Sequence, residues 1–212
     1  MTAPLVVARD LSLTTSRGEA FSQLNFELPR GSLGAVVGEA GSGKSALLLA
    51  MTGRMRGVTG ALTIDGESRP RRIARLTSVA RIDRLVTPEP SLCLEDCITE
   101  RTLADGASAR ARYANYLKTA RILGLEADRT TLYASLTPAE QTRAAVALAA
   151  IRPASLIVLD DLDDGLTVDE QAALWEGLHR LAAEGAVIVA ATSEPTTVPE
   201  TAVTINLENH DA

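Results

Sequence analysis

The sequence predicts an α/β fold that combines a mostly parallel sheet with an N-terminal antiparallel β element and an inserted helical region. Three observations support this fold. A glycine-rich turn links a short apolar segment to a helix-forming segment at residues 33–51. Two apolar segments flank a helical pattern at residues 156–191, which is the order of a βαβ unit. Two further strand-like segments precede the glycine-rich turn, so this turn does not follow the first strand.

The N-terminal elements follow from the positions of apolar residues and turns. Residues 5–13 and 21–28 are expected to form two strands joined by a turn. The uniformly apolar residues 33–37 favour a buried strand, and residues 46–51 favour a helix directly after the glycines. Residues 60–66 favour another strand that runs into an Asp-Gly turn. We therefore expect an antiparallel β element beside the main sheet.

The second half of the chain is expected to be helical first and then βαβ. Residues 107–123 carry apolar side chains at helical spacing. Residues 156–160 and 186–191 show no polar alternation, which is typical of parallel strands buried on both faces. Between them, Thr167 is a good N-cap, and Glu170 stands three residues later, as in a capping box. A helix is therefore predicted from this point to about residue 184.

The chain is expected to form one domain over residues 1–212. It is long enough to bury a substantial core, since 46% of its residues are hydrophobic. The predicted elements divide it into a core made of residues 1–85 and 152–212 and a helical subdomain of residues 86–151.

The glycine-rich turn matches the phosphate-binding pattern G-x-x-x-x-G-K-[ST] in full. Its residues are Gly38, Glu39, Ala40, Gly41, Ser42, Gly43, Lys44 and Ser45. Glycines let backbone N–H groups approach a phosphate closely, Lys44 can reach the β- and γ-phosphates, and the Ser45 hydroxyl can ligate Mg²⁺. The chain has only two lysines among 21 basic residues, and one of them stands here. We predict that this loop binds a nucleoside triphosphate.

Composition argues against several other classes of protein. The net charge is −6, and the chain lacks a basic arm or an aromatic stacking platform, so we expect no nucleic-acid partner. No apolar run approaches the length of a membrane span, and no secretory signal opens the chain. A cytoplasmic location is expected, either free or docked on a membrane partner. Cys93 and Cys97 lack further ligands at zinc-site spacing, and we expect them to be buried thiols.

Taken in this order, the features resemble the ATP-binding subunit of ATP-binding cassette (ABC) transporters, from residue 5 to residue 207. The resemblance implies a P-loop NTPase core that binds ATP and Mg²⁺, with Ser45 and Asp160 at the metal. It also implies that Asp161, the acid after Asp160, polarises the attacking water. Lys44 is expected to be the second catalytic residue. The implied partners are an integral-membrane permease and a second nucleotide-binding domain, as a homodimer or a heterodimer. The protein would lie at the cytoplasmic face of the membrane and drive or gate the permease.

Several positions depart from the family's pattern. Asp161 replaces a glutamate, and its shorter side chain would lie roughly 1–1.5 Å farther from the water, a displacement that can lower the rate by ~10²-fold. Ser193 replaces a histidine and offers no positive charge to the γ-phosphate. The family's glutamine falls near Arg81, and its adenine-stacking aromatic falls near Thr15, so neither expected residue is present.

The family signature Leu-Ser-Gly-Gly-Gln is also altered, and it aligns with Leu136, Thr137, Pro138, Ala139 and Glu140. This segment favours a helix start, because Thr137 suits the N-cap, Pro138 suits the first turn and Glu140 completes a capping box. It suits a γ-phosphate contact less well, because proline lacks an N–H and glutamate adds negative charge.

Two alternatives to a working ATPase subunit remain. The first is a catalytically impaired subunit that binds ATP and dimerises but turns over little, since the signature, the histidine and the glutamate are all changed. The second is a small P-loop metabolite kinase. It is disfavoured, because such kinases usually carry their phosphate loop on the first strand. Six arginines between residues 69 and 84 are expected to form either a solvated face of a strand and its turns or the rim of a permease-docking groove.

Overall fold

The computed structural model describes residues 3–16, 18–82, 85–104 and 109–208, and it contains a five-stranded parallel sheet as its centre. The strand order is β5-β6-β7-β3-β8, and every neighbouring pair is parallel. The strands are β3 (Leu33–Val37), β5 (Thr77–Arg81), β6 (Leu156–Leu159), β7 (Val187–Thr192) and β8 (Val203–Asn206). The predicted α/β fold and its buried parallel strands are therefore confirmed.

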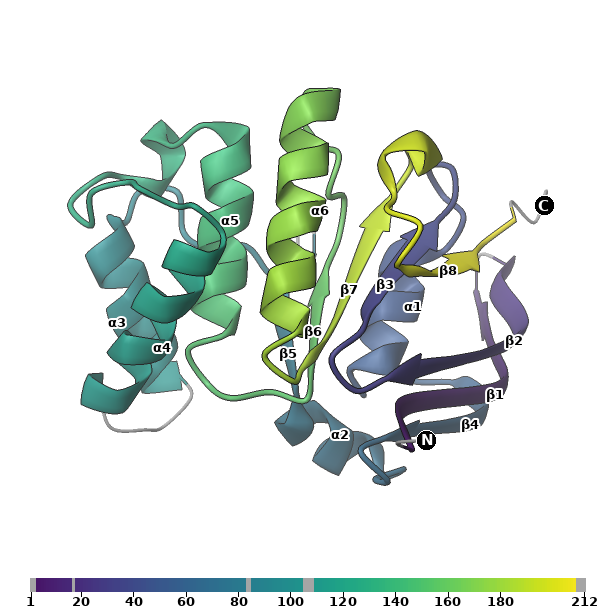
Figure 1. Cartoon of the computed structure of the whole chain (residues 1–212). Coiled ribbons are helices and arrows are strands. Elements are labelled where there is room, and N and C mark those ends of the chain that lie inside the picture. Colours follow the sequence, from purple (N-terminus) through teal and green to yellow (C-terminus); the bar gives the residue numbers. More distant parts are fainter. Residues whose placement is uncertain (1–2, 17, 83–84, 105–108, 209–212) are drawn as a thin grey trace.

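A second, antiparallel sheet lies beside the first (Figure 1). It has the order β2-β1-β4, with β1 (Pro4–Thr15), β2 (Gly18–Pro29) and β4 (Val58–Ile64). Asp65 and Gly66, which follow β4, both have positive φ angles, of 52° and 77°. The predicted antiparallel element and its Asp-Gly turn are confirmed, although β4 begins and ends two residues earlier than expected.

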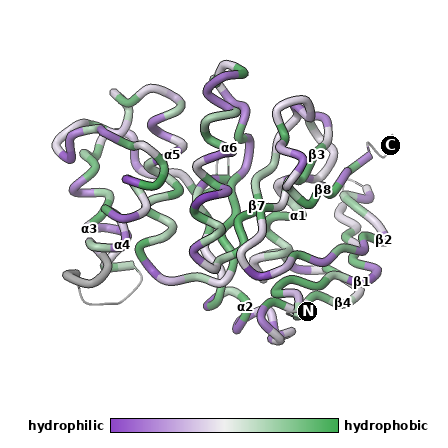
Figure 2. The backbone as a smooth tube through the Cα atoms, viewed as in Figure 1, coloured by the Kyte–Doolittle hydropathy of each residue, from purple (hydrophilic) through white to green (hydrophobic). Residues whose placement is uncertain are grey.

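Helices cover both faces of the parallel sheet. On one face, α1 (Lys44–Met51) packs with the antiparallel sheet in a single hydrophobic cluster. On the other face, α5 (Pro138–Ala149) and α6 (Val168–Ala182) share a second cluster with β6 and β7 (Figure 1). Figure 2 shows hydrophobic residues along the strands in the middle of the molecule, between these layers. Loops follow the carboxyl ends of the parallel strands.

The middle of the chain is helical. It contains α3 (Leu94–Ala104), α4 (Ala109–Ile122) and a 3-10 turn, η1 (Tyr133–Ser135), before α5. These elements share a third hydrophobic cluster, which includes the buried Tyr116 and Tyr133. The first two residues of the helix predicted at 107–123 lie outside the described residues, and the rest is confirmed. Among the described residues, no helix is long and apolar enough to cross a membrane.

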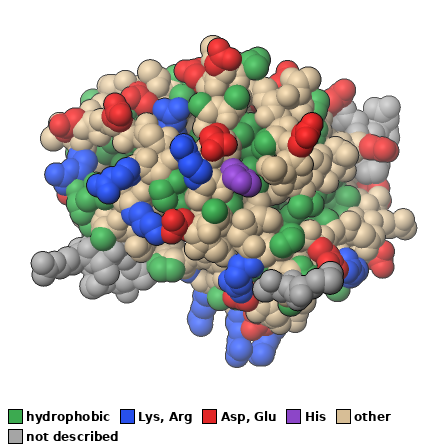
Figure 3. All heavy atoms as spheres, viewed as in Figure 1, with side chains coloured by type: hydrophobic (Ala, Val, Ile, Leu, Met, Phe, Trp, Pro, Cys, Tyr) green, Lys and Arg blue, Asp and Glu red, His purple; other side chains and the backbone are tan. Residues whose placement is uncertain are grey.

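The arginine-rich segment contains a helix that the sequence did not predict, α2 (Pro70–Leu76), followed by strand β5. Proline at the first helical turn and arginine along the helix both favour this conformation. Arg71, Arg72 and Arg75 are exposed on α2, and Figure 3 shows basic side chains projecting at this edge of the molecule. Arg81 lies at the opposite, carboxyl end of β5, and Arg84 lies outside the described residues. The arginines therefore do not form one continuous surface.

Candidate nucleotide-binding site

The glycine-rich loop connects β3 to α1 and is packed too closely for side chains at two positions. Gly43 has a φ of 89°, and a Cβ placed there would lie 2.1 Å from the Ala20 carbonyl oxygen of β2. A Cβ on Gly38 would lie 2.4 Å from Ser42 Oγ. Glycine is therefore needed at both positions, and the loop is held against the antiparallel sheet.

The polar groups of this loop suit an anion. Lys44 is only 7% exposed, and its Nζ donates to the carbonyl oxygens of Gly38 (2.8 Å) and Glu39 (2.9 Å). The first turn of α1 has no side-chain cap, because Gly43 occupies the N-cap position. Uncapped N–H groups at a helix N-terminus attract phosphate. Ser45 is exposed at the same helix start, so its hydroxyl is accessible to a ligand.

Asp160 follows β6 and is fully buried. Its Oδ1 accepts from the Asp161 N–H at 3.1 Å, whereas its Oδ2 has no hydrogen-bond partner among the described residues. Burial raises the pKa of Asp160 above its ordinary value, although the nearby Ser45 hydroxyl and Lys44 ammonium oppose this shift. A buried carboxylate oxygen without a donor fits a divalent cation, and Mg²⁺ prefers oxygen ligands of this kind. The structure brings this acid to Lys44 and Ser45, as the sequence predicts.

Asp161 adopts a left-handed backbone conformation, with a φ of 45°. Such a conformation is unfavourable for a residue with a Cβ, and it persists where the surroundings hold it. Here Arg81 Nη2 donates to the Asp161 carbonyl oxygen at 2.7 Å. Burial raises the pKa of Asp161, and the neighbouring Asp160 raises it further. A pocket of about 370 Å³ lies in front of this residue and is lined by Arg81, Asp161, Asp163, Asp164 and Ser193.

Ser193, the position of the family's histidine, is already engaged. Its backbone N–H donates to both carboxylate oxygens of Asp163, at 3.2 and 3.3 Å, and its hydroxyl donates to Asp163 Oδ2. Although burial acts to raise the pKa of Asp163, the hydrogen bonds from Ser193 and Thr192 outweigh it and hold this pKa below its ordinary value. Asp163 was not predicted as a site residue, because no local pattern connects it to a serine thirty residues away.

The signature segment forms the helix start that the sequence predicts. Thr137 is the N-cap of α5, and its Oγ1 accepts from the Glu140 N–H at 3.3 Å. Glu140 Oε2 in turn accepts from the N–H and the hydroxyl of Thr137, both at 2.9 Å. The Thr167–Glu170 capping box of α6 has the same arrangement. Thr137 and Glu140, the two side chains of the signature segment that could meet a phosphate, are therefore hydrogen-bonded to each other.

Neither of the two aromatic residues of β2 is available to stack on a base. Phe21 is 1% exposed and Phe26 is 8% exposed, both within the core. Thr15, the position expected for a stacking aromatic, is exposed at the end of β1, and its hydroxyl donates to the Gly18 carbonyl oxygen at 3.1 Å. Thr15 can offer an adenine ring only a small contact.

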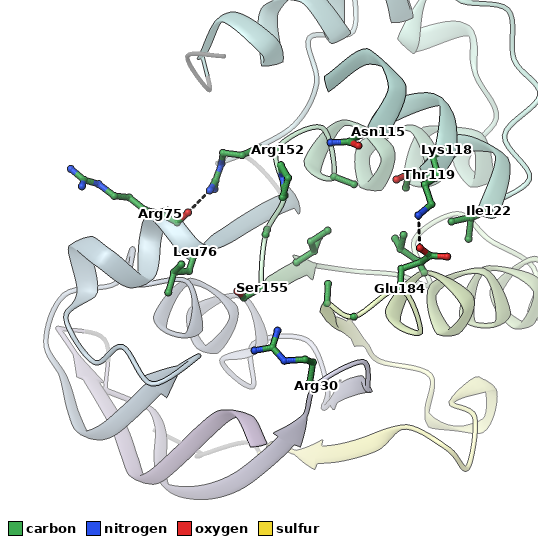
Figure 4. A pocket seen from close by; sticks show the side chains of 17 residues that line it. Arg30, Arg75, Leu76, Asn115, Lys118, Thr119, Ile122, Arg152, Ser155 and Glu184 are labelled. Carbon is green, nitrogen blue, oxygen red and sulfur yellow. Dashed lines mark hydrogen bonds and ion pairs between the residues drawn. The ribbon is translucent and has the colours of Figure 1, made fainter. Parts of the chain in front are cut away.

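A second cavity, of about 530 Å³, lies at the amino ends of the parallel strands (Figure 4). Lys118 pairs with Glu184 across it, and Arg152 donates to the carbonyl oxygens of Arg75 and Thr77. These cations are thus engaged with groups of the protein. The cavity is at the edge of the sheet opposite the glycine-rich loop and is separate from the nucleotide site.

Comparisons with known proteins agree with this geometry. The family model described as ABC transporter matches residues 21–163. The arabinose import ATP-binding protein AraG of Rhizobium meliloti is 26% identical over 178 residues, which are 81% of this chain and 35% of AraG. A putative ABC transporter ATP-binding protein of Streptomyces coelicolor is 30% identical over 202 residues, which are 91% of this chain and 70% of that protein. The chain thus spans about a third of the length of some curated relatives and more of others.

Solved structures show the same fold. The cbiO1 protein of Clostridium perfringens, described as part of the ABC transporter complex cbiONQ, superposes with a TM-score of 0.81 at 17% identity. The match covers 97% of this chain and 85% of that protein. A structure described as the ATP-binding subunit of an ABC transporter has a TM-score of 0.75 at 23% identity, with 96% of this chain and 85% of the other covered. The chain therefore has the P-loop NTPase fold of these ATPases and belongs to the ABC transporter family.

Proposed function

We propose that this chain binds Mg·ATP in the loop of residues 38–45 and acts as the ATPase subunit of an ABC transporter. The observation that carries the proposal is the fully buried Asp160 Oδ2, which lies beside Lys44 and Ser45 and for which the described residues supply no hydrogen-bond donor. In the proposed complex the loop N–H groups and Lys44 hold the phosphates, and Ser45 and Asp160 hold Mg²⁺. When bound, Mg²⁺ supplies positive charge that neutralises the phosphate oxygens during transfer.

Asp161 is proposed as the residue that polarises the attacking water. Its carboxyl group lines the 370 Å³ pocket, and burial raises its pKa, which makes its carboxylate a stronger proton acceptor. Asp161 follows the end of β6. Its left-handed backbone conformation and the hydrogen bond from Arg81 to its carbonyl oxygen fix the direction of its short side chain. The chain thus keeps an acid at this position, although a shorter one than the family's glutamate.

The proposed partners are a separate membrane permease and a second nucleotide-binding domain, as a homodimer or a heterodimer. Names of relatives such as the arabinose import ATP-binding protein support a transport role. The protein would then lie at the cytoplasmic face of the membrane. In this proposal, residues 1–85 and 152–212 form the ATP-binding core, and residues 86–151 form the helical subdomain.

A second candidate function is an ATP-binding regulatory subunit with little turnover. It is favoured by the side chains that already have partners: Thr137 and Glu140 close a capping box, and Ser193 is bonded to Asp163. Neither segment offers the γ-phosphate a free donor side chain in this state. Binding of ATP is common to both functions, and turnover separates them.

Binding is tested with the two lysines of the chain as a matched pair. We expect Lys44→Ala to abolish measurable Mg·ATP binding in calorimetric titrations. Lys118→Ala removes an exposed lysine paired with Glu184 and should leave the affinity unchanged. Equal affinity for wild type and Lys44→Ala would refute the proposed site.

Turnover is tested by phosphate release from wild type, Asp161→Asn and Asp161→Glu. A working ATPase predicts loss of activity in Asp161→Asn, and a gain in Asp161→Glu if chain length at this position limits the rate. ATP binding without phosphate release in all three proteins would favour the regulatory function.

A further inference from the structure

We propose that Arg81 is a second cation, in addition to Lys44, that binds the γ-phosphate of ATP from within the same chain, an inference that rests on the proposed function. Ser193 has no charge where the family has a histidine. Among the described residues that line the 370 Å³ pocket, Arg81 is the one cation, and the others are three aspartates and Ser193. A terminal phosphate entering this pocket would meet three carboxylates without Arg81.

The position of Arg81 follows from the end of β5. The pairing of β5 with β6 shifts between Val79 and Arg81, since Val79 pairs with Val158 and Arg81 pairs with Leu159. β5 thus holds one extra residue over this stretch, as in a β-bulge, and bulges redirect side chains next to active sites. The Arg81 carbonyl oxygen accepts from the Asp160 N–H at 2.9 Å. Arg81 is therefore anchored by its backbone to the peptide that carries the proposed metal ligand.

The guanidinium of Arg81 reaches across the end of β6. Its Nη2 donates to the Asp161 carbonyl oxygen at 2.7 Å, and the side chain is only partly exposed. Asp161 is the residue that would polarise the water, and this water must stand next to the γ-phosphorus. A cation held on the backbone of Asp161 consequently lies beside the terminal phosphate, which Lys44 can also reach, and not beside the inner phosphates, which the loop would hold.

The chemistry of arginine supports a phosphate contact. A guanidinium has five N–H donors and no acceptor, so it cannot ligate Mg²⁺, and it stays charged at any relevant pH. Its planar fork can donate to the Asp161 carbonyl oxygen with one nitrogen and to a phosphate oxygen with another. Arg81 would thereby connect the γ-phosphate to the backbone of Asp161 through a hydrogen bond to each.

The test compares affinities for Mg·AMP-PNP, which has a third phosphate and resists hydrolysis, and for Mg·ADP, which has two. We expect Arg81→Ala to weaken AMP-PNP binding by roughly 10- to 100-fold, the effect of one or two charge-assisted hydrogen bonds, and to change ADP binding by less than about 3-fold. Arg81→Lys keeps the charge without the fork and should give an intermediate loss. Arg75→Ala removes an exposed arginine of α2 and should change neither affinity.

Equal weakening of AMP-PNP and ADP binding in Arg81→Ala would overturn the inference, because it would show that Arg81 only holds the backbone of Asp161. Unchanged AMP-PNP binding would overturn it as well, while leaving the proposed function intact. If the alanine variant fails to fold, an Arg81→Lys variant with wild-type preference for AMP-PNP over ADP is the contradicting result. Wild-type protein that binds neither nucleotide would overturn both the proposed function and this inference.

Discussion

Replacing Gly43 with alanine tests how closely the phosphate-binding loop packs against β2, and Gly41 provides the matched control. The two glycines have nearly equal φ angles, 87° at Gly41 and 89° at Gly43. They differ in their surroundings: a Cβ on Gly41 has nothing within 4 Å, whereas a Cβ on Gly43 lies 2.1 Å from the Ala20 carbonyl oxygen. Both variants share the backbone strain, and only Gly43→Ala adds a steric clash.

The magnitudes follow from these two terms. A left-handed alanine lowers the free energy of unfolding by about 1–2 kcal/mol, which is the expected effect of Gly41→Ala. The clash at Gly43 cannot be relieved by a flexible side chain, because the contacted atom belongs to the backbone, and overpacking of this kind adds about 1–3 kcal/mol. Gly43→Ala should therefore lower the free energy of unfolding by about 2–5 kcal/mol.

Urea denaturation followed by tryptophan fluorescence measures both values. Trp175 is the single tryptophan of the chain and is 1% exposed, so its emission should shift when the core opens. Equal destabilisation in the two variants would refute the reasoning, since it would show that the loop does not press on β2.

Three further outcomes follow from the same structure. Thr137→Ala and Thr167→Ala each remove one capping box, and the two boxes have the same arrangement. Each substitution should lower the free energy of unfolding, measured by urea titration, by about 0.5–2 kcal/mol. No effect at either site would contradict the assigned caps. Burial raises the pKa of Cys97 to about 11, so alkylation of a Cys93→Ser variant should be slow at pH 8 and accelerate about ten-fold per pH unit as the thiolate forms. A rate at pH 8 equal to that of the Cys97→Ser variant, in which the half-buried Cys93 remains, would contradict the burial of Cys97.

Local patterns predicted much of this molecule because their physical causes are local. Both capping boxes depend on residues three positions apart, and the buried strands on continuous apolar runs. Helix α2 escaped prediction because it is short, three of its seven residues are arginines, and Ile73 is its one buried residue. Strand β8 is short, and among its four residues only Ile205 is buried, so neither periodicity nor an apolar run indicated it.

The candidate site likewise contains one part that local sequence predicts and another part that it does not. The loop from Gly38 to Ser45 is contiguous, so spacing alone indicates it as a candidate phosphate site. The bond between Arg81 and Asp161 joins residues 80 positions apart, and the bonds between Asp163 and Ser193 join residues 30 positions apart. Such contacts depend on strand order and register, which the sequence does not display.

The magnesium dependence of ATP binding tests the central claim most directly, because Asp160 Oδ2 is a buried carboxylate oxygen that has no hydrogen-bond partner in the described part of the chain. Calorimetric titrations with ATP would compare wild type and Asp160→Asn, with and without Mg²⁺. The asparagine is nearly isosteric and neutral, so the variant should fold. We predict that Mg²⁺ strengthens ATP binding to wild type, and that Asp160→Asn loses roughly 10- to 100-fold or more of this effect, as expected when a metal-site group is removed. An equal Mg²⁺ effect in both proteins would contradict the assignment of Asp160 to the metal.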